Sequence, residues 1–288
     1  MKNSDLLKAY FEMTKPRILS LVLVTMSLGF YLGGKGIHSF YTLFFLLLGA
    51  GLVCSGSSAL NNYLEWESDA LMTRTKNRPI PLGIITPTQA LNFGIILVLT
   101  GLIILACKVN LLTAFLSLLT AFLYILVYTP MKKITWLNTT IGAIPGALPP
   151  MGGWTAATGN IEIGAWVLFL ILFVWQHPHF YSIAWMFRED YARGGFKMLP
   201  SLDPEGKRTF FQIILFSLIL IPVSLMPTML GMSGMIYAAG AFLAGLNLLW
   251  IGRNLSLAKT HQAAHKLLKA TVFYLPLLFI LILLDIKQ

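Results

Sequence analysis

The sequence has few charged residues, and especially few acidic ones. Charged residues make up 11% of the chain, with 11 Asp and Glu against 21 Lys and Arg, and the mean hydropathy is +0.75. Soluble domains carry roughly 25% charged residues, so this composition excludes an ordinary soluble fold. No polar stretch is long enough to enclose a core of its own. We therefore expect residues 1–288 to form a single domain embedded in a membrane.

Cysteine is also scarce, with only Cys54 and Cys107 in the whole chain. Two cysteines so far apart in sequence predict neither a disulfide framework nor a zinc site. The first residues, 1–5, match neither a cleavable secretory signal nor an Arg- and Ser-rich transit peptide. A bacterial plasma membrane is the simplest expected location.

Long apolar runs, with few or no charges, account for most of the chain. Each reaches or approaches the ~20 residues that span a bilayer as a helix. The runs cover residues 18–34, 36–64, 79–107, 109–131, 134–161, 163–187, 209–252 and 270–284. The run 209–252 is long enough for two helices, with a break near 231–234. The sequence thus predicts an all-α integral membrane protein with nine transmembrane helices.

The positions of Lys and Arg indicate an orientation. If the N-terminus is cytoplasmic, every Lys and Arg falls on the cytoplasmic side except Lys35, Lys108 and Lys287. This asymmetry favours a cytoplasmic N-terminus, an outside C-terminus and an odd number of spans. Basic residues that alternate with membrane spans do not form a soluble basic face, so we expect no nucleic-acid partner.

Polar side chains recur at four-residue steps near the end of the second apolar run, at Asn61, Glu65 and Asp69. A four-residue step advances about 400° around a helix and roughly 6 Å along it, so the three lie on one face. Basic residues follow at Arg74, Lys76 and Arg78. Carboxylates hold Mg²⁺, Mg²⁺ binds phosphate oxygens, and Arg and Lys bind the remaining oxygens. The pattern predicts a diphosphate site.

A second acidic segment, Arg188-Glu189-Asp190-Tyr191, follows the sixth apolar run. In the predicted topology it lies on the same side of the membrane as Asp69. The two acidic helix ends would form opposite walls of one central cavity, open to the cytoplasmic side. The alternative is a pair of solvated loops whose charges only set the topology, and the charge pattern alone leaves both interpretations open.

Two segments resemble a known family. Residues 61–79, with Asn-x-x-x-Glu-x-x-x-Asp and Met72-x-Arg74-Thr75-x-x-Arg78-Pro79, resemble the first signature of the UbiA-type intramembrane prenyltransferase superfamily. His179-Phe180, followed by Asp190-Tyr191-Ala192-Arg193-x-Gly195-x-x-Met198-Leu199-Pro200, resembles the members that farnesylate haem. The resemblance covers essentially the whole chain from Thr14 onward and agrees with nine spans. The chain departs from the pattern at Asn62 and Glu65, where many members have Asp.

The resemblance implies transfer of a farnesyl group from farnesyl diphosphate to a vinyl group of haem b, with Mg²⁺ as cofactor. It implies a catalytic and metal-binding set of Asn61, Glu65, Asp69 and Asp190, with Glu189 as a further metal ligand. It implies diphosphate contacts from Arg74, Lys76, Arg78, Lys132, Lys133, Arg188 and Lys197. The expected partners are the lipid bilayer and an enzyme of haem A synthesis. Such a site stabilises the charge on the departing diphosphate and needs no protein nucleophile.

Two histidines flank a proline near the inner end of the sixth apolar run, at His177 and His179. One interpretation makes His179, or less favourably His177, a contact for haem, because imidazole suits iron. The other makes them interior side chains that satisfy backbone carbonyls freed by Pro178.

Two other classes of protein remain as alternatives. A prenyltransferase of the same superfamily that acts on a quinone precursor would use the same diphosphate site with a phenolic acceptor. A secondary transporter would also have many spans, but it would place ionisable residues near the bilayer midplane rather than at one membrane surface.

Overall fold

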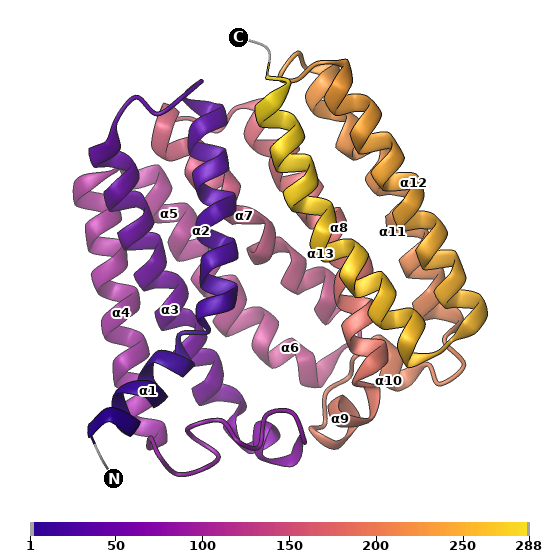
Figure 1. The fold of residues 1–288 in the computed structure, drawn as a ribbon. Helices are drawn as coiled ribbons and strands as arrows, with labels where there is room; N and C mark the ends of the chain where they lie inside the picture. The colour runs from indigo at the N-terminus through magenta and orange to yellow at the C-terminus, as the bar shows by residue number, and fades with distance from the viewer. Residues whose placement is uncertain (1–2, 287–288) are drawn as a thin grey trace.

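The computed structural model describes residues 3–286, and these form helices joined by short loops (Figure 1). The only β-type pairing in this part of the chain is an isolated bridge between Ser233 and Ile286. A π-helical turn, η1 (Leu123–Tyr128), joins α5 to α6. The α-helices are α1 (Asn3–Met13), α2 (Pro16–Gly33), α3 (Phe40–Leu71), α4 (Pro87–Lys108), α5 (Leu111–Phe122), α6 (Thr129–Ile134), α7 (Asn138–Thr158), α8 (Ile163–Met186), α9 (Arg188–Arg193), α10 (Leu199–Leu202), α11 (Lys207–Met229), α12 (Met235–Ala258) and α13 (His261–Leu284).

Eight helical segments in the described part of the chain are long and apolar enough to cross a membrane, if α5, η1 and α6 are counted as one segment, Leu111–Ile134. The ninth long helix is α7, with 21 residues. Its many Gly, Ala, Thr and Pro residues make it less apolar than the others, and most of its side chains are buried between neighbouring helices. The expected all-helical membrane fold is confirmed.

Side-chain caps set the start of several long helices. The Ser39 side chain accepts a hydrogen bond from the Thr42 N–H at the start of α3. Thr86 and Gln89 form a reciprocal capping box at the start of α4, and Asn110 caps α5. These bonds satisfy amide groups that a helix leaves unpaired at its first turn, so each loop enters its helix at a defined residue.

The bundle has two halves, with α2 to α7 on one side and α8 and α11 to α13 on the other (Figure 1). The interior helix α7 links them, since it packs against α2 and α5 and also against α8. Glycines allow the closest approach of α2 and α7: a Cβ atom on Gly153 would lie 1.9 Å from the Met26 carbonyl oxygen. Such contacts replace hydrophobic burial as the basis of helix packing in a membrane.

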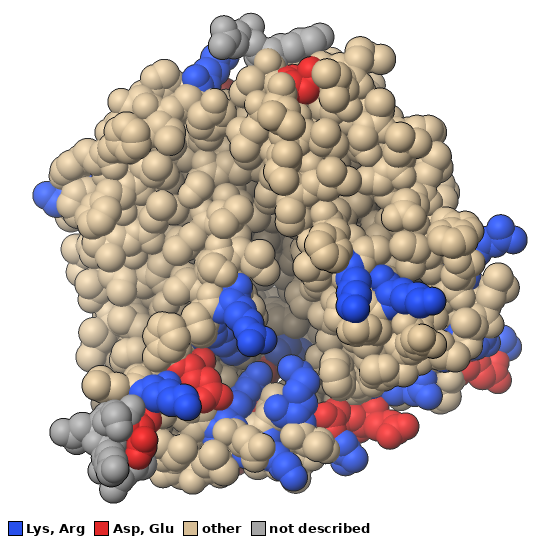
Figure 2. All heavy atoms as spheres, in the orientation of Figure 1, with Lys and Arg blue, Asp and Glu red and all other residues tan. Residues whose placement is uncertain are grey.

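Charged side chains gather at one end of the bundle. Figure 2 shows Lys, Arg, Asp and Glu concentrated at the lower end, where Figure 1 shows α1, α9 and α10, while the upper part of the face in view carries few charges. A hollow between the two halves opens toward this charged end (Figure 2). Helix α1 and the end of α13 lie at opposite ends (Figure 1), as an odd number of spans requires.

Candidate active site

Three polar side chains line one buried face of α3 near its C-terminal end. Asn61, Glu65 and Asp69 are 1%, 5% and 1% exposed. They follow one another at successive turns, as the four-residue spacing predicts. Two carboxylates buried this deeply are costly unless cations or hydrogen bonds compensate them.

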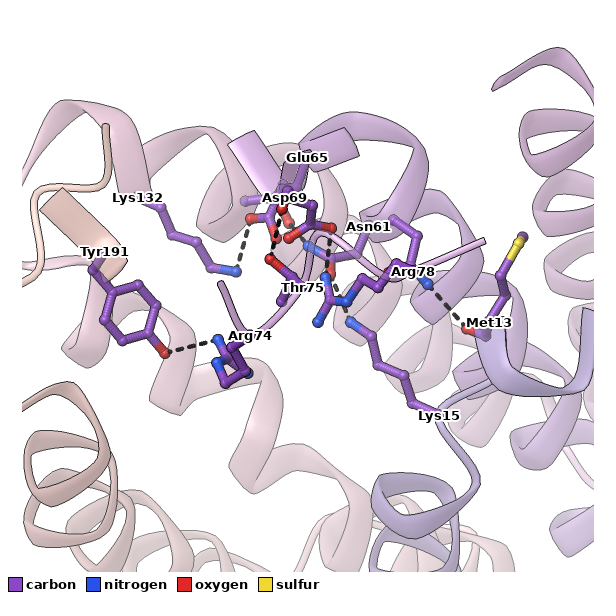
Figure 3. A network of polar contacts seen from close by, with 12 residues as sticks. Met13, Lys15, Asn61, Glu65, Asp69, Arg74, Thr75, Arg78, Lys132 and Tyr191 are labelled. Atoms are coloured by element: carbon purple, nitrogen blue, oxygen red, sulfur yellow. Dashed lines mark hydrogen bonds and ion pairs between the residues drawn. The ribbon is translucent and has the colours of Figure 1, made fainter. Parts of the chain in front are cut away.

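Each of these three side chains is paired with one basic residue, and the three basic residues come from different segments of the chain (Figure 3). The pairs are Lys15 Nζ with Asn61 Oδ1 at 2.7 Å, Lys132 Nζ with Glu65 Oε1 at 2.7 Å, and Arg78 Nη1 with Asp69 Oδ2 at 2.5 Å. We call these six residues the paired cluster. It brings together the junction of α1 and α2, the end of α3, the loop after it, and α6.

Lys15 was not among the residues predicted from the sequence. It lies between α1 and α2 in the left-handed backbone region, with φ 51° and ψ 62°. Asn61 accepts its hydrogen bond and donates another from Nδ2 to Thr129 Oγ1, at 3.0 Å. Burial, followed by the nearby charge of Arg78, lowers the pKa of Lys15 to about 7. The N-terminal segment therefore supplies a third basic side chain to the site.

Two buried oxygens beside these pairs, Asp69 Oδ1 and Asn62 Oδ1, have neither a hydrogen-bond partner nor an ion-pair partner in the described part of the chain. Carboxylate and amide oxygens are hard ligands of the kind that Mg²⁺ prefers. No group of three or more His, Cys, Asp or Glu side chains among residues 5–286 is placed to hold a metal. The residues present fit an ion that takes few protein ligands and completes its shell with water and phosphate oxygens, as Mg²⁺ does.

Asp190 joins α9 to the loop that follows α3. Its carboxylate accepts hydrogen bonds from the backbone N–H groups of Thr73, at 3.1 Å, and Arg74, at 3.2 Å, and it is ion-paired with Arg193. Burial by itself would raise the pKa of Asp190, but the hydrogen bonds from Arg193, Thr73 and Arg74 outweigh it and hold the pKa below its usual range. The two acidic helix ends therefore meet through this loop.

The metal-binding roles of Asp190 and Glu189 stay predictions. Both oxygens of Asp190 already accept hydrogen bonds from the loop, and Glu189 is exposed. The contacts that Asp190 makes indicate a role in holding the loop 72–86 in place.

The remaining basic residues of the predicted set lie outside the paired cluster. Arg74 lies over the rings of Phe187 and Tyr191, at 5.5 and 5.6 Å, and its guanidinium donates to the Tyr191 hydroxyl at 3.4 Å. Arg188 lies over the Trp185 ring at 4.4 Å. The side chains of Lys76, Lys133 and Lys197 are exposed. The Lys197 N–H also donates to the Lys132 carbonyl oxygen at 2.7 Å, which holds the loop after α9 against α6.

The two histidines have different surroundings on α8. His177 is fully buried, and its ring nitrogens contact the Phe173 carbonyl oxygen at 2.9 Å and Thr140 Oγ1 at 3.2 Å. His179 is half-buried and contacts Thr271 Oγ1 of α13 through Nδ1, at 2.9 Å. The sequence favoured His179 over His177 as a haem contact, and the structure shows which neighbours each ring has.

A membrane-embedded helical bundle with buried acidic side chains, basic residues and free oxygens at one end has the features of an intramembrane enzyme that acts on lipid diphosphates. The comparison with known proteins gives the same class. A model of the UbiA prenyltransferase family matches residues 22–279. The chain belongs to the UbiA prenyltransferase family and is a prenyltransferase.

Curated relatives align with nearly the whole chain. A protoheme IX farnesyltransferase from Solibacter usitatus (strain Ellin6076) is 46% identical, over 97% of this chain and 99% of the relative. One from Salinibacter ruber (strain DSM 13855 / M31) is also 46% identical, over 96% of this chain and 98% of the relative.

Solved structures share the fold at low sequence identity. A digeranylgeranylglyceryl phosphate synthase has a TM-score of 0.81 at 17% identity, covering 98% of both chains. A UbiA homologue from Archaeoglobus fulgidus bound to DMAPP and Mg²⁺ has a TM-score of 0.69 at 17% identity, covering 95% of this chain and 98% of the other.

Proposed function

We propose that this protein transfers a farnesyl group from farnesyl diphosphate to a vinyl group of haem b, at the charged end of the helical bundle. The paired cluster carries the proposal, because it pairs each of two carboxylates and one amide with a basic side chain at 2.5 to 2.7 Å. The names of the relatives at 46% identity support haem as the acceptor.

The basic residues bind and orient the diphosphate. Lys15, Arg78 and Lys132 surround the α3 face from three sides, so their charges converge on one small volume. When the allylic carbon–oxygen bond breaks, the electron pair leaves with the diphosphate, and fixed cations stabilise the added charge. Arg74, the half-buried Arg188 and the exposed Lys76, Lys133 and Lys197 form the outer part of this positive region.

Mg²⁺ fits the polar face of α3, where Asn61, Glu65 and Asp69 are its proposed protein ligands. The unpartnered Asp69 Oδ1 supports this assignment, as does the Mg²⁺ bound to the related structure from Archaeoglobus fulgidus. When bound, Mg²⁺ supplies positive charge to the diphosphate oxygens. The side chains of α3 hold their oxygens on one helix face, and the backbone of the loop 72–86 is fixed by Asp190.

The acceptor and the protein environment account for the remaining chemistry. The electron-rich vinyl group attacks the allylic carbon, and water adds to the resulting cation and releases a proton to solvent, which gives a hydroxyethylfarnesyl side chain. The apolar helices exclude other water from the allylic cation before transfer. No side chain acts as a covalent nucleophile in this scheme.

We further propose that the charged end faces the cytoplasm of a bacterial cell and that residues 1–288 act as one domain. The concentration of Lys and Arg at that end supports this orientation. The interaction with an enzyme of haem A synthesis, which would take the product as its substrate, stays a prediction. A phenolic acceptor is less favoured, because the relatives that align over nearly the whole chain are named for protohaem.

One assay tests the proposal. Purified protein in lipid nanodiscs is given haem b, farnesyl diphosphate and Mg²⁺, and the haem product is identified by mass. We expect a mass increase equal to one farnesyl group plus one hydroxyl group, and no product when a chelator removes Mg²⁺. If haem stayed unchanged and a phenolic acceptor were prenylated, the acceptor substrate would be a quinone precursor and not haem.

A further inference from the structure

His179 has one ring nitrogen for which no protein partner is found among the described residues. Its Nδ1 contacts Thr271 Oγ1 at 2.9 Å, whereas Nε2 makes no hydrogen bond to the described side chains or backbone. The side chain is half-buried. His177 differs, because both of its nitrogens are engaged and its ring is stacked on Phe216 at 3.5 Å.

The contacts of Thr271 determine which nitrogen of His179 carries the proton. A threonine hydroxyl has a single proton to donate. The Thr271 hydroxyl donates it to the Leu268 carbonyl oxygen, at 2.7 Å, and a carbonyl can only accept. Both contacts of Thr271 are satisfied together only if His179 Nδ1 donates to Oγ1. The proton then lies on Nδ1, and Nε2 has a free lone pair.

The ring of His179 is also fixed in orientation. Trp175 stacks on it with centroids 4.7 Å apart and an interplanar angle of 20°. The Trp175 indole N–H donates to the Thr271 carbonyl oxygen at 2.9 Å. Thr271 thus orients Trp175 through its backbone and His179 through its side chain. Metal-binding histidines are commonly held in this way, with the second nitrogen donating to an oxygen that fixes the tautomer.

We propose that His179 binds the iron of the haem substrate through Nε2, and that Thr271 is a positioning residue that keeps this nitrogen unprotonated. The inference rests on the proposed function, since it concerns the haem acceptor. Coordination would hold the porphyrin in place and takes no part in the bond changes of farnesyl transfer. His177 does not share this role, because hydrogen bonds and stacking already occupy its ring.

Spectroscopy of bound haem tests the proposal. Ferric haem b is titrated into the full-length protein and into variants, and the Soret band and electron paramagnetic resonance spectrum are recorded. The wild type is expected to give a spectrum of imidazole-ligated haem. His179→Gly should lose this spectrum, and added imidazole should restore it.

Thr271 is tested with two variants of similar size. Thr271→Val removes the hydroxyl and keeps the shape of the side chain, so we expect haem affinity to fall about 10- to 100-fold and the ligand-field signature to change. Thr271→Ser keeps the hydroxyl and should behave as the wild type. A role of Thr271 in folding alone would lower the melting temperature without changing the spectrum of the haem that is bound.

The results separate this inference from the proposed function. If wild-type protein makes farnesylated haem while His179→Gly keeps the wild-type spectrum, the iron-binding role is overturned and the function stands. If Thr271→Val keeps the wild-type spectrum and affinity, the positioning role of Thr271 is overturned. If wild-type protein neither binds haem nor alters it, both are overturned. If Thr271→Val does not fold, imidazole rescue of His179→Gly still decides whether His179 binds iron.

Discussion

Lys15 Nζ lies 2.7 Å from Asn61 Oδ1, although 46 residues separate the two in sequence. This contact brings the N-terminal segment into the paired cluster. In the proposed enzyme it gives Lys15 access to the diphosphate oxygens.

We predict that Lys15→Met raises the KM for farnesyl diphosphate about 10- to 100-fold, because a charge-assisted hydrogen bond contributes about 1.5–3 kcal/mol. Steady-state kinetics with varied farnesyl diphosphate would measure the effect. Arg17→Gln is the matched control, since Arg17 is exposed two residues away. Equal effects of the two substitutions would assign the loss to net charge at the membrane surface.

Asp69 is the strongest candidate for a metal ligand on α3. Asp69→Asn keeps the shape of the side chain but removes the negative charge, so we expect activity to fall by at least about 100-fold, as when a transition-state electrostatic contact is lost. Expression and haem binding should stay near the wild-type level. Glu67→Gln on an exposed position of the same helix is the control. Near-normal turnover by Asp69→Asn would count against the metal role.

The ion pair between Glu65 and Lys132 is buried, with side chains 6% and 14% exposed. Removing one partner leaves an uncompensated charge, so Glu65→Gln or Lys132→Met alone should destabilise the protein by about 3–5 kcal/mol. The double variant should recover much of this stability, because no buried charge is left unpaired. Thermal unfolding in detergent measures the recovery. The pair would be a minor contributor to stability if all three variants kept the melting temperature of the wild type.

The same variants separate stability from catalysis. Activity should stay low in the double variant even where stability returns, since the proposed reaction uses both charges. A double variant that regained both stability and turnover would show that the pair serves only the fold.

The sequence predicted well both the helices and the polar side chains that share one face of α3, because both features depend on local patterns. Long apolar runs predict spans wherever they occur, and a four-residue spacing places Asn61 and Asp69 on one face of any helix. Lys15 was missed because its contact joins distant segments and its left-handed backbone has no signal in the sequence.

The surroundings of Asp190 and of the two histidines were not predictable for a related reason. Asp190 accepts hydrogen bonds from the backbone amides of Thr73 and Arg74, and backbone groups carry no sequence signal. His177 and His179 are two residues apart on one helix, but one faces Thr140 of α7 and the other Thr271 of α13. Only the packing of neighbouring helices separates them.

Asp190 provides a test between two roles. Asp190→Asn can accept a hydrogen bond from only one of the two loop amides, so we expect a looser loop 72–86 and a KM for farnesyl diphosphate raised about tenfold, as for loss of one hydrogen bond to a charged group. The Mg²⁺ concentration for half-maximal activity should not change. An increase in that concentration would show instead that Asp190 binds the metal directly, as the sequence pattern first suggested.

The contact between α2 and α7 gives a prediction about stability. A Cβ atom at Gly153 would lie 1.9 Å from the Met26 carbonyl oxygen, and a backbone oxygen cannot move away without shifting a whole helix. Gly153→Ala should therefore lower stability by about 1–3 kcal/mol or more, the usual cost of overpacking. Gly51→Ala is the control, because a Cβ atom there meets only Leu19 and Leu23 side chains at 3.9 Å.

Thermal unfolding in detergent should show a lower melting temperature for Gly153→Ala than for the wild type. Gly51→Ala should melt at or above the wild-type temperature, since alanine also favours the helix. Because α7 links the two halves of the bundle, Gly153→Ala should also reduce turnover, and an unchanged melting temperature would mean that α2 and α7 pack less closely than the structure has them.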